Sequence, residues 1–194
     1  MVPRLCVLFS AAAATSLIVA CGKTHERESA SSTGVASMSL AVSSSAFAQN
    51  AEIPAKYTCE GQDASPPLSW SGAPSTTKSF ALIVDDPDAP DPAAPKMTYV
   101  HWVLYDLPAT VTSLDEDATK QPPAGARQGM NDGKRAGYGG PCPPIGRHRY
   151  FFKVYALDNT LGDLGSPSKA ALESAMKGHI VAQGELVGTY QKKK

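Results

Sequence analysis

Thr98–Leu107 reads TYVHWVLYDL, a run of β-branched and aromatic residues that stops at Pro108. Residues of these types are enriched in strands, and a proline that follows such a run marks its end. The run therefore predicts a β-strand. Strict alternation along it would place His101 on the same face as Val103 and on the opposite face from Trp102.

Further runs of this kind lie on either side in the sequence. Phe80–Val84 (FALIV) is continuously apolar, which is typical of a strand buried on both faces. Arg149–Leu157 (RYFFKVYAL) is a third strong pattern, and Leu68–Trp70 and Gly184–Tyr190 (GELVGTY) are weaker ones. Strands at this spacing, with Pro and Gly at the corners, predict a mainly β fold, an antiparallel two-sheet sandwich.

One or two peripheral helices are expected to cover this sandwich. Ser166 and Pro167 precede an apolar stripe in Ser168–Lys177, and Gly178 follows it. Serine caps helices, proline is favoured at the first helical position, and glycine ends them. This pattern predicts a helix over 168–177 that opens at Ser166-Pro167.

Length and composition fit one folded domain. The chain has 194 residues, of which 42% are hydrophobic, with 16 glycines and 16 prolines. Its 18 basic and 18 acidic residues balance, so no long-range field favours a nucleic acid partner. An apolar content of this size with no net charge argues against intrinsic disorder.

The first 21 residues have the pattern of an export signal. Arg4 precedes an apolar run from Leu5 to Ala20, which is shorter than a membrane-spanning helix needs. The run ends in LIVAC at Cys21, which resembles a bacterial lipobox, so we expect a signal peptide over 1–20, a lipidated Cys21 and a flexible tether to residue 37. The alternative is cleavage nearby that leaves a spare cysteine. Gly22 after Cys21 favours the periplasmic side of the outer membrane.

Two cysteines remain after export. Cys6 leaves with the signal peptide and Cys21 carries lipid, so Cys59 and Cys142 are left in an oxidising compartment. They can form a disulfide or remain as buried free thiols, and the sequence leaves both alternatives open.

Three segments hold polar side chains beside rigid turns. Asp86 and Asp88 follow the FALIV run in DDPDAP, where the proline should make them project to the same side. His101 lies within its apolar strand. The alternative interpretation of the aspartates is an acidic turn that only faces solvent. The alternative interpretation of His101 is a core histidine whose hydrogen bonds are all made within the protein.

The third segment is the loop GGPCPPIGRHRY at 139–150, which contains Gly140 and Pro141. Glycines allow backbone amides to approach a ligand, and prolines stiffen the loop. His148 and Tyr150 leave this loop on one strand face and could complete an anion cradle.

Five blocks of the sequence resemble the phosphatidylethanolamine-binding protein family, in its bacterial YbhB/YbcL branch, named Raf kinase inhibitor-like. They are YTCEGQDASPPLSW (57–70), DDPDAP (85–90), VHWVLYDLP (100–108), GGPCPPIGRHRYFFKVYALD (139–158) and GHIVAQGELVGTY (178–190). The resemblance covers residues 38–191 and leaves 192–194 as a basic tail. The loop before the HRY block is short for the family.

The resemblance implies a binding protein with a small pocket for phosphate-like anions or phospholipid head groups, without cofactor or catalytic residues. By motif position, its site residues are Asp86, Asp88, His101, Gly140, Pro141, His148 and Tyr150. A carboxylate beside an imidazole favours the protonated ring, so we expect anion binding to tighten as pH falls.

Two other functions compete with this one. The Pro-rich loop 86–95 could block an envelope protease or another envelope protein. Two histidines and two aspartates could also ligate a catalytic metal, although no metal-ligand spacing such as HExxH is present.

Overall fold

Strand β4 (Ser79–Asp86) is the centre of the larger sheet, and all eight of its residues are buried, as its continuously apolar sequence predicts. The structure, a computed structural model, describes residues 38–193. The order of the six strands in the larger sheet is β1-β9-β8-β4-β5-β7. Their bounds are β1 Met38–Ser39, β5 Tyr99–Pro108, β7 Arg127–Gln128, β8 His148–Leu157 and β9 Ile180–Tyr190.

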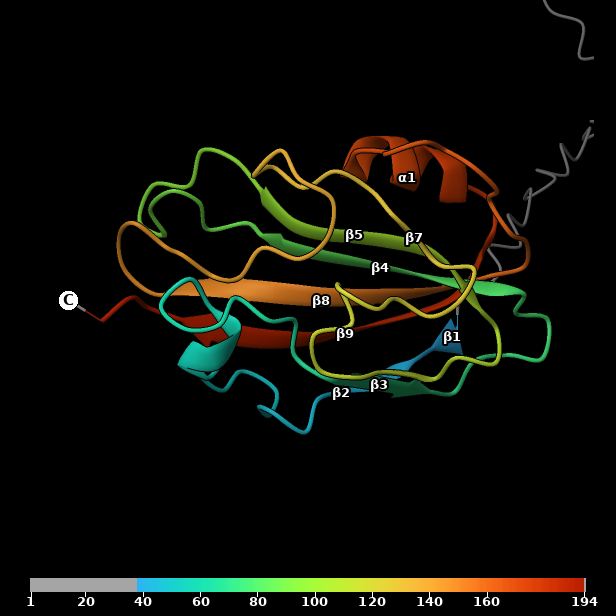
Figure 1. The fold of residues 1–194 in the computed structure, drawn as a ribbon, viewed down its shortest axis with the longest axis horizontal. Helices are drawn as coiled ribbons and strands as arrows, with labels where there is room; N and C mark the ends of the chain where they lie inside the picture. The colour runs from blue at the N-terminus through green and yellow to red at the C-terminus, as the bar shows by residue number, and fades with distance from the viewer. Residues whose placement is uncertain (1–37, 194) are drawn as a thin grey trace, which may run out of the picture. The chain divides into compact units, whose positions relative to one another are not determined.

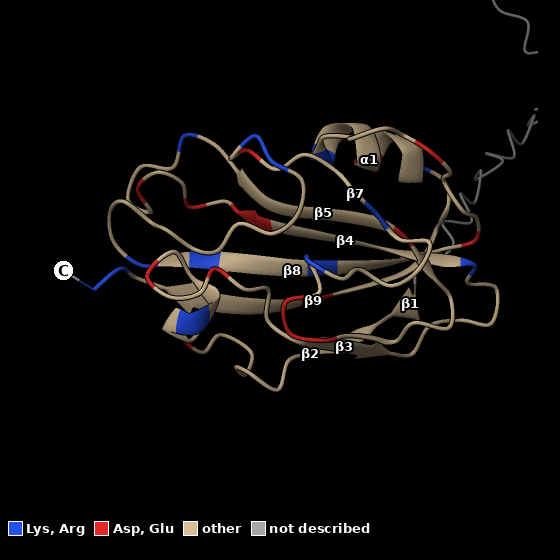
Figure 2. Cartoon of the chain, in the orientation of Figure 1, with Lys and Arg blue, Asp and Glu red and all other residues tan. Residues whose placement is uncertain are grey.

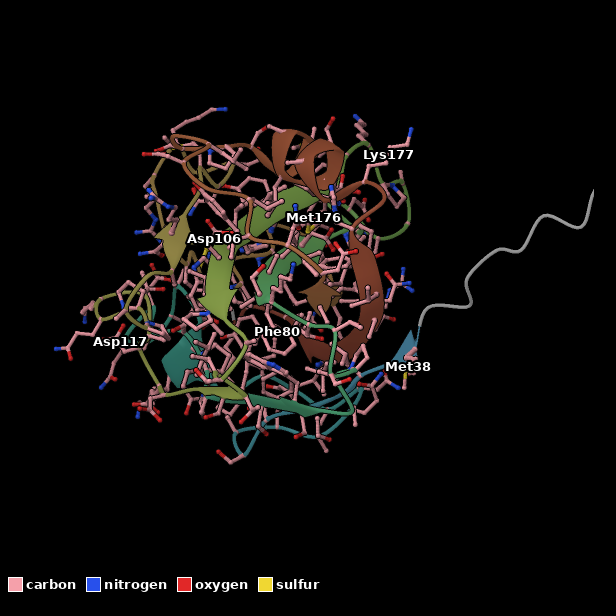
Figure 3. The ribbon with its side chains drawn as sticks, turned by 90° about the vertical axis from the view of Figure 1, so that its right-hand side faces the viewer. Met38, Phe80, Asp106, Asp117, Met176 and Lys177 are labelled. Atoms are coloured by element: carbon pink, nitrogen blue, oxygen red, sulfur yellow. A yellow bond between two sulfur atoms is a disulfide. The ribbon has the colours of Figure 1, made fainter. Side chains whose placement is uncertain are left out.

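A smaller sheet packs on one face of the larger one (Figure 1). Its order is β2-β3-β6, with bounds β2 Ala41–Ser43, β3 Leu68–Ser71 and β6 Ser113–Leu114. Large aromatic side chains fill the space between the sheets: Trp70 meets Phe80 edge-on with ring centroids 5.5 Å apart. Phe80 lies between the two layers in the end-on view of Figure 3. A short 3-10 helix, η1 (Ala55–Tyr57), follows β2.

Helix α1 (Lys169–Met176) covers the opposite face of the larger sheet (Figure 1). It buries Leu172 and Met176 in a second apolar cluster. An ion pair also attaches the helix to the sheet, because the ammonium group of Lys169 in α1 contacts the buried carboxylate of Asp85 in β4 at 2.5 Å. Lys153 in β8 contacts the same carboxylate at 2.9 Å.

The helix begins later than the sequence predicts. Ser168, and not Ser166, is the N-cap, and its hydroxyl accepts a hydrogen bond from the Ala171 N–H. Pro167 lies outside the helix because its carbonyl accepts a hydrogen bond from the Met130 N–H, which ties this residue to the neighbouring loop.

The predicted fold class, mainly β with two sheets, is confirmed. One strand pair differs from the antiparallel prediction, because β1 runs parallel to β9 and makes the larger sheet mixed. A parallel pair needs no hairpin, and nearly the whole domain separates these two strands in sequence. Among the described residues no helix is long and apolar enough to cross a bilayer. The signal peptide, the lipidated Cys21 and the tether are predictions that lie outside the described residues.

A β-bulge changes the predicted alternation in β5. Val84 pairs with Trp102 but the next residue, Asp85, pairs with Val100, so His101 is an extra residue without a partner in β4. Such an insertion locally reverses which face a side chain occupies. His101 therefore lies against Tyr150 on the sandwich side, and the prediction that it shares a face with Val103 is wrong.

Candidate ligand-binding site

Strand direction brings the polar segments together. Because β4 is antiparallel to both β5 and β8, the end of β4 lies beside the beginnings of its two neighbours. This is the end of the sheet from which β9 leaves towards the C-terminus (Figure 1). A pocket of about 420 Å³ opens here. Five of the predicted site residues line it: Asp86, His101, Gly140, His148 and Tyr150.

His148 and Asp86 form a buried pair at the floor of the pocket. The Nδ1 atom of His148 lies 2.7 Å from Asp86 Oδ2, and Nε2 lies 2.9 Å from the Ile145 carbonyl oxygen. Both partners are acceptors, so both ring nitrogens are engaged by the protein. The second oxygen of Asp86 accepts the Asp88 N–H at 2.8 Å. Neither ring nitrogen is left for a ligand, and His148 orients Asp86 and the loop where the sequence suggested a free donor.

His101 has one ring nitrogen free of protein partners. Its Nδ1 donates to the Gly139 carbonyl at 2.5 Å, while its Nε2 has no hydrogen bond within residues 38–193. Burial lowers the pKa of this imidazole, and the hydrogen bond to Gly139 and the nearby Asp86 carboxylate oppose that effect only in part. The nearby carboxylates do favour the protonated ring of His101, as expected, but desolvation is the larger effect and the net shift of the pKa is downward.

Tyr150 supplies an unused donor. Its side chain is fully buried, its ring lies 5.2 Å from that of His101 in an edge-on arrangement, and its hydroxyl has no hydrogen-bond partner within residues 38–193. Burial raises the pKa of this hydroxyl, so it keeps its proton. Buried hydroxyls nearly always have a partner, so an unpaired one that lines a pocket indicates a group that a ligand completes.

Asp88 does not line the pocket, although its position in the motif predicted that it would. Its two oxygens accept hydrogen bonds from the Arg149 guanidinium at 2.7 Å and 2.9 Å, and one of them also accepts the Arg149 N–H. This pairing lowers the pKa of the Asp88 carboxyl. Since Asp86 and Asp88 are both paired already, neither is free to accept an ammonium group.

The wall formed by the 139–142 loop is clamped to the segment after η1. The Gly140 N–H donates to Asp63 Oδ1 at 2.6 Å, and the Cys59 N–H donates to the Pro141 carbonyl at 3.1 Å. Pro141 itself does not line the pocket. A Cβ on Gly140 would lie 2.6 Å from the Tyr57 carbonyl oxygen, so this close approach is what requires glycine.

The structure joins Cys59 and Cys142 by a disulfide that spans the same two segments. Both cysteines also line the pocket. The covalent link ties the loop to the segment after η1, and the sequence alone could not show that the two cysteines are neighbours.

Sequence reasoning missed two charged residues of the lining, Asp63 and Arg135. Asp63 lies in the YTCEGQD block, where its acidic side chain is the only sequence feature that could have marked it as a candidate site residue. Arg135 lies in 130–136, a segment between recognisable motifs, and no sequence pattern marks it.

The free donors of the site suit an anion. Tyr150 donates one hydrogen bond, and His101 donates a second, from Nε2, once the ring is protonated. Within residues 38–193, no three His, Cys, Asp or Glu side chains are placed to hold a metal ion.

Comparisons with known proteins find similar chains. The chain is 45% identical over 149 residues to a UPF0098 protein of Methanothermobacter thermautotrophicus, with 76% of this chain and 95% of that protein covered. It is 49% identical over 166 residues to the UPF0098 protein PH1269 of Pyrococcus horikoshii, with 82% and 80% covered.

Two solved structures are similar. Chlamydia trachomatis CT736, described as a homologue of phosphatidylethanolamine-binding protein, is 43% identical with a TM-score of 0.73, and 81% of this chain and 100% of that chain are covered. Escherichia coli YbcL, described as a member of the mammalian family, is 37% identical with a TM-score of 0.72, and 79% and 99% are covered. The family model for phosphatidylethanolamine-binding protein matches residues 43–191. The chain therefore belongs to the phosphatidylethanolamine-binding protein family.

Proposed function

We propose that this protein binds a small ligand through a phosphate-type group, either a free phosphate ester or the head group of a phospholipid. The observation that carries the proposal is the buried hydroxyl of Tyr150, a residue that lines the pocket, because this hydroxyl has no hydrogen-bond partner within residues 38–193. Leaving such a group unpaired costs about 1–3 kcal/mol, and a ligand acceptor would remove that cost. His101 Nε2 lies free beside it.

The pocket is larger than one phosphate. Its volume of about 420 Å³ equals that of roughly 14 water molecules at about 30 Å³ each, whereas phosphate has five heavy atoms. Apolar side chains such as Met97, which is half-exposed, and Pro144 line the same space. This combination favours a phosphate group with an organic substituent.

Native mass spectrometry of the purified protein, combined with calorimetry, tests the proposal. We expect a co-purified adduct with the mass of phosphate or of a phospholipid. We also expect heat of binding on titration with inorganic phosphate and with O-phosphoethanolamine. Absence of both an adduct and any binding heat would contradict the proposal. An adduct of phospholipid mass would identify the lipid as the source of the group.

We also propose that the protein works on the periplasmic side of the envelope, anchored by a lipidated Cys21. Support comes from the apolar run that ends in LIVAC and from the Cys59–Cys142 disulfide, a bond typical of oxidising compartments. Mass spectrometry of the mature N-terminus is the test. A peptide that begins with unmodified Cys21, or beyond it, would rule out the anchor.

A further inference from the structure

The floor of the pocket attracts an anion only weakly at neutral pH. In the Asp86–His148 pair both ring nitrogens already contact protein acceptors, so His148 has no free donor for an anion. His101 donates its Nδ1 proton to Gly139, and burial lowers its pKa, so at neutral pH its Nε2 has a lone pair and cannot donate. The Tyr150 hydroxyl is then the only ready donor among these floor residues. If the pocket holds a phosphate group, a positive charge must come from elsewhere.

Arg135 is the one lysine or arginine among the described residues that line the pocket. Elsewhere the charges are interspersed over strands and loops (Figure 2). The Nη2 atom of Arg135 donates to Asp63 Oδ2 at 2.6 Å, and the remaining guanidinium N–H groups have no partner within residues 38–193. Just over half of this side chain is exposed, 54% by area.

The backbone fixes Arg135 at the rim. The Asn131 N–H donates to the Arg135 carbonyl at 3.0 Å, and the Arg135 N–H donates to Asn131 Oδ1 at 3.2 Å, which closes a turn over a buried asparagine. The guanidinium lies against the loop wall, since a Cβ on Gly139 would lie 3.2 Å from Nη2. The guanidinium of Arg135, a positive charge with free donors, is thus held at the mouth of a pocket that has no other lysine or arginine in its described lining.

We propose, resting on the proposed function, that Arg135 selects the ligand by the charge of its phosphate group and that Asp63 limits the strength of this attraction. An arginine with uncommitted N–H groups can form paired hydrogen bonds with phosphate oxygens. Such an interaction favours a phosphomonoester dianion over a phosphodiester monoanion. Because the side chain is half-exposed, salt should screen the effect.

A purely structural role for Arg135 makes a different prediction. Asp63 holds the Gly140 N–H with one oxygen and Arg135 with the other, so Arg135 could simply brace the loop through Asp63. In Asp63→Asn the amide oxygen can still accept the Gly140 N–H, while the negative charge beside Arg135 is gone. Loss of a brace weakens ligand binding, whereas release of the guanidinium leaves it equal or makes it tighter.

Calorimetry with the purified protein and inorganic phosphate at pH 8 separates these alternatives. We expect Arg135→Gln to weaken phosphate binding about five- to tenfold, Arg135→Lys to restore part of the loss, and Asp63→Asn to bind as tightly as wild type or more tightly. The matched control is Arg127→Gln, because Arg127 is similarly exposed and pairs with Asp106 and Asp163 away from the pocket. Circular dichroism melting reports whether each variant is folded.

A second arm uses dimethyl phosphate, a phosphodiester monoanion. Wild type should prefer inorganic phosphate, and Arg135→Gln should lose most of that preference and most of its salt dependence. If wild type binds neither probe, the proposed function fails and this inference with it. If wild type binds but Arg135→Gln behaves like Arg127→Gln, or if Asp63→Asn weakens binding as much as Arg135→Gln does, only the role of Arg135 is overturned.

Discussion

Replacing Tyr150 with phenylalanine should move ligand affinity and protein stability in opposite directions. The substitution removes only the hydroxyl, which is buried, lines the pocket and has no partner within residues 38–193. A hydrogen bond to a charged group contributes about 1.5–3 kcal/mol. Tyr150→Phe should therefore weaken phosphate binding by roughly tenfold to a hundredfold.

The ligand-free protein should become more stable at the same time. An unpaired buried hydroxyl costs about 1–3 kcal/mol, and phenylalanine fits the same space without it. We expect stabilisation by about 1 kcal/mol, which raises Tm by roughly 2–4 °C for a domain of this size.

Tyr105→Phe is the matched control. Tyr105 is as buried as Tyr150, but its hydroxyl donates to the Gly165 carbonyl at 3.1 Å, on the side of the larger sheet that α1 covers. Its loss should lower stability by about 1 kcal/mol and leave phosphate affinity unchanged.

Calorimetric titration and thermal melting of wild type and the two variants provide the data. Tyr150→Phe with unchanged phosphate affinity, or with stability lowered as in Tyr105→Phe, would refute the assignment of the hydroxyl to the ligand.

Three further outcomes follow from the site. Because burial lowers the pKa of His101, binding of an anion should protonate its ring, so affinity for sulfate, whose own charge is constant, should rise as pH falls below about 6.5. His101→Gln should flatten this pH profile of sulfate affinity. A profile that is already flat in wild type would contradict the role of the ring. Arg149 lowers the pKa of Asp88, so the pair stabilises the fold at pH values above the ordinary carboxyl pKa of 3.8 and loses this effect as pH falls through the lowered pKa. Urea titrations should show Asp88→Asn less stable than wild type by about 1–2 kcal/mol at pH 7, and this difference in stability should be smaller at pH 3. Gly140→Ala forces a Cβ to within 2.6 Å of the Tyr57 carbonyl oxygen, so chemical denaturation should show that the free energy of unfolding falls by about 1–3 kcal/mol, and phosphate binding should weaken. An alanine variant equal to wild type in both stability and phosphate affinity would show that the loop relaxes freely.

The strands were predictable because their hydrophobic patterns are strong. The FALIV run forms the buried centre of β4, and RYFFKVYAL forms most of β8. Once β4 is known to be antiparallel to β5 and β8, the meeting of Asp86, His101 and His148 follows from chain direction alone.

Side-chain roles were less predictable because they depend on tertiary contacts. A bulge of one residue at His101 reverses its face, and no local sequence signal marks that bulge. Whether His148 is a free donor depends on the Ile145 carbonyl, and whether Asp88 lines the pocket depends on Arg149. Arg135 reaches the rim through a turn closed by Asn131, and this contact lies outside every motif.

The most direct test of the account is a titration of the isotope-labelled protein with inorganic phosphate, followed by nuclear magnetic resonance. We predict that the largest shift changes occur at the His101 ring, at the amides of Gly139, Gly140 and Cys142, and at the Tyr150 ring. Changes centred on Lys153 and Lys169, where two ammonium groups meet Asp85 on the other face of the sheet, would contradict the account, as would a spectrum that phosphate leaves unchanged.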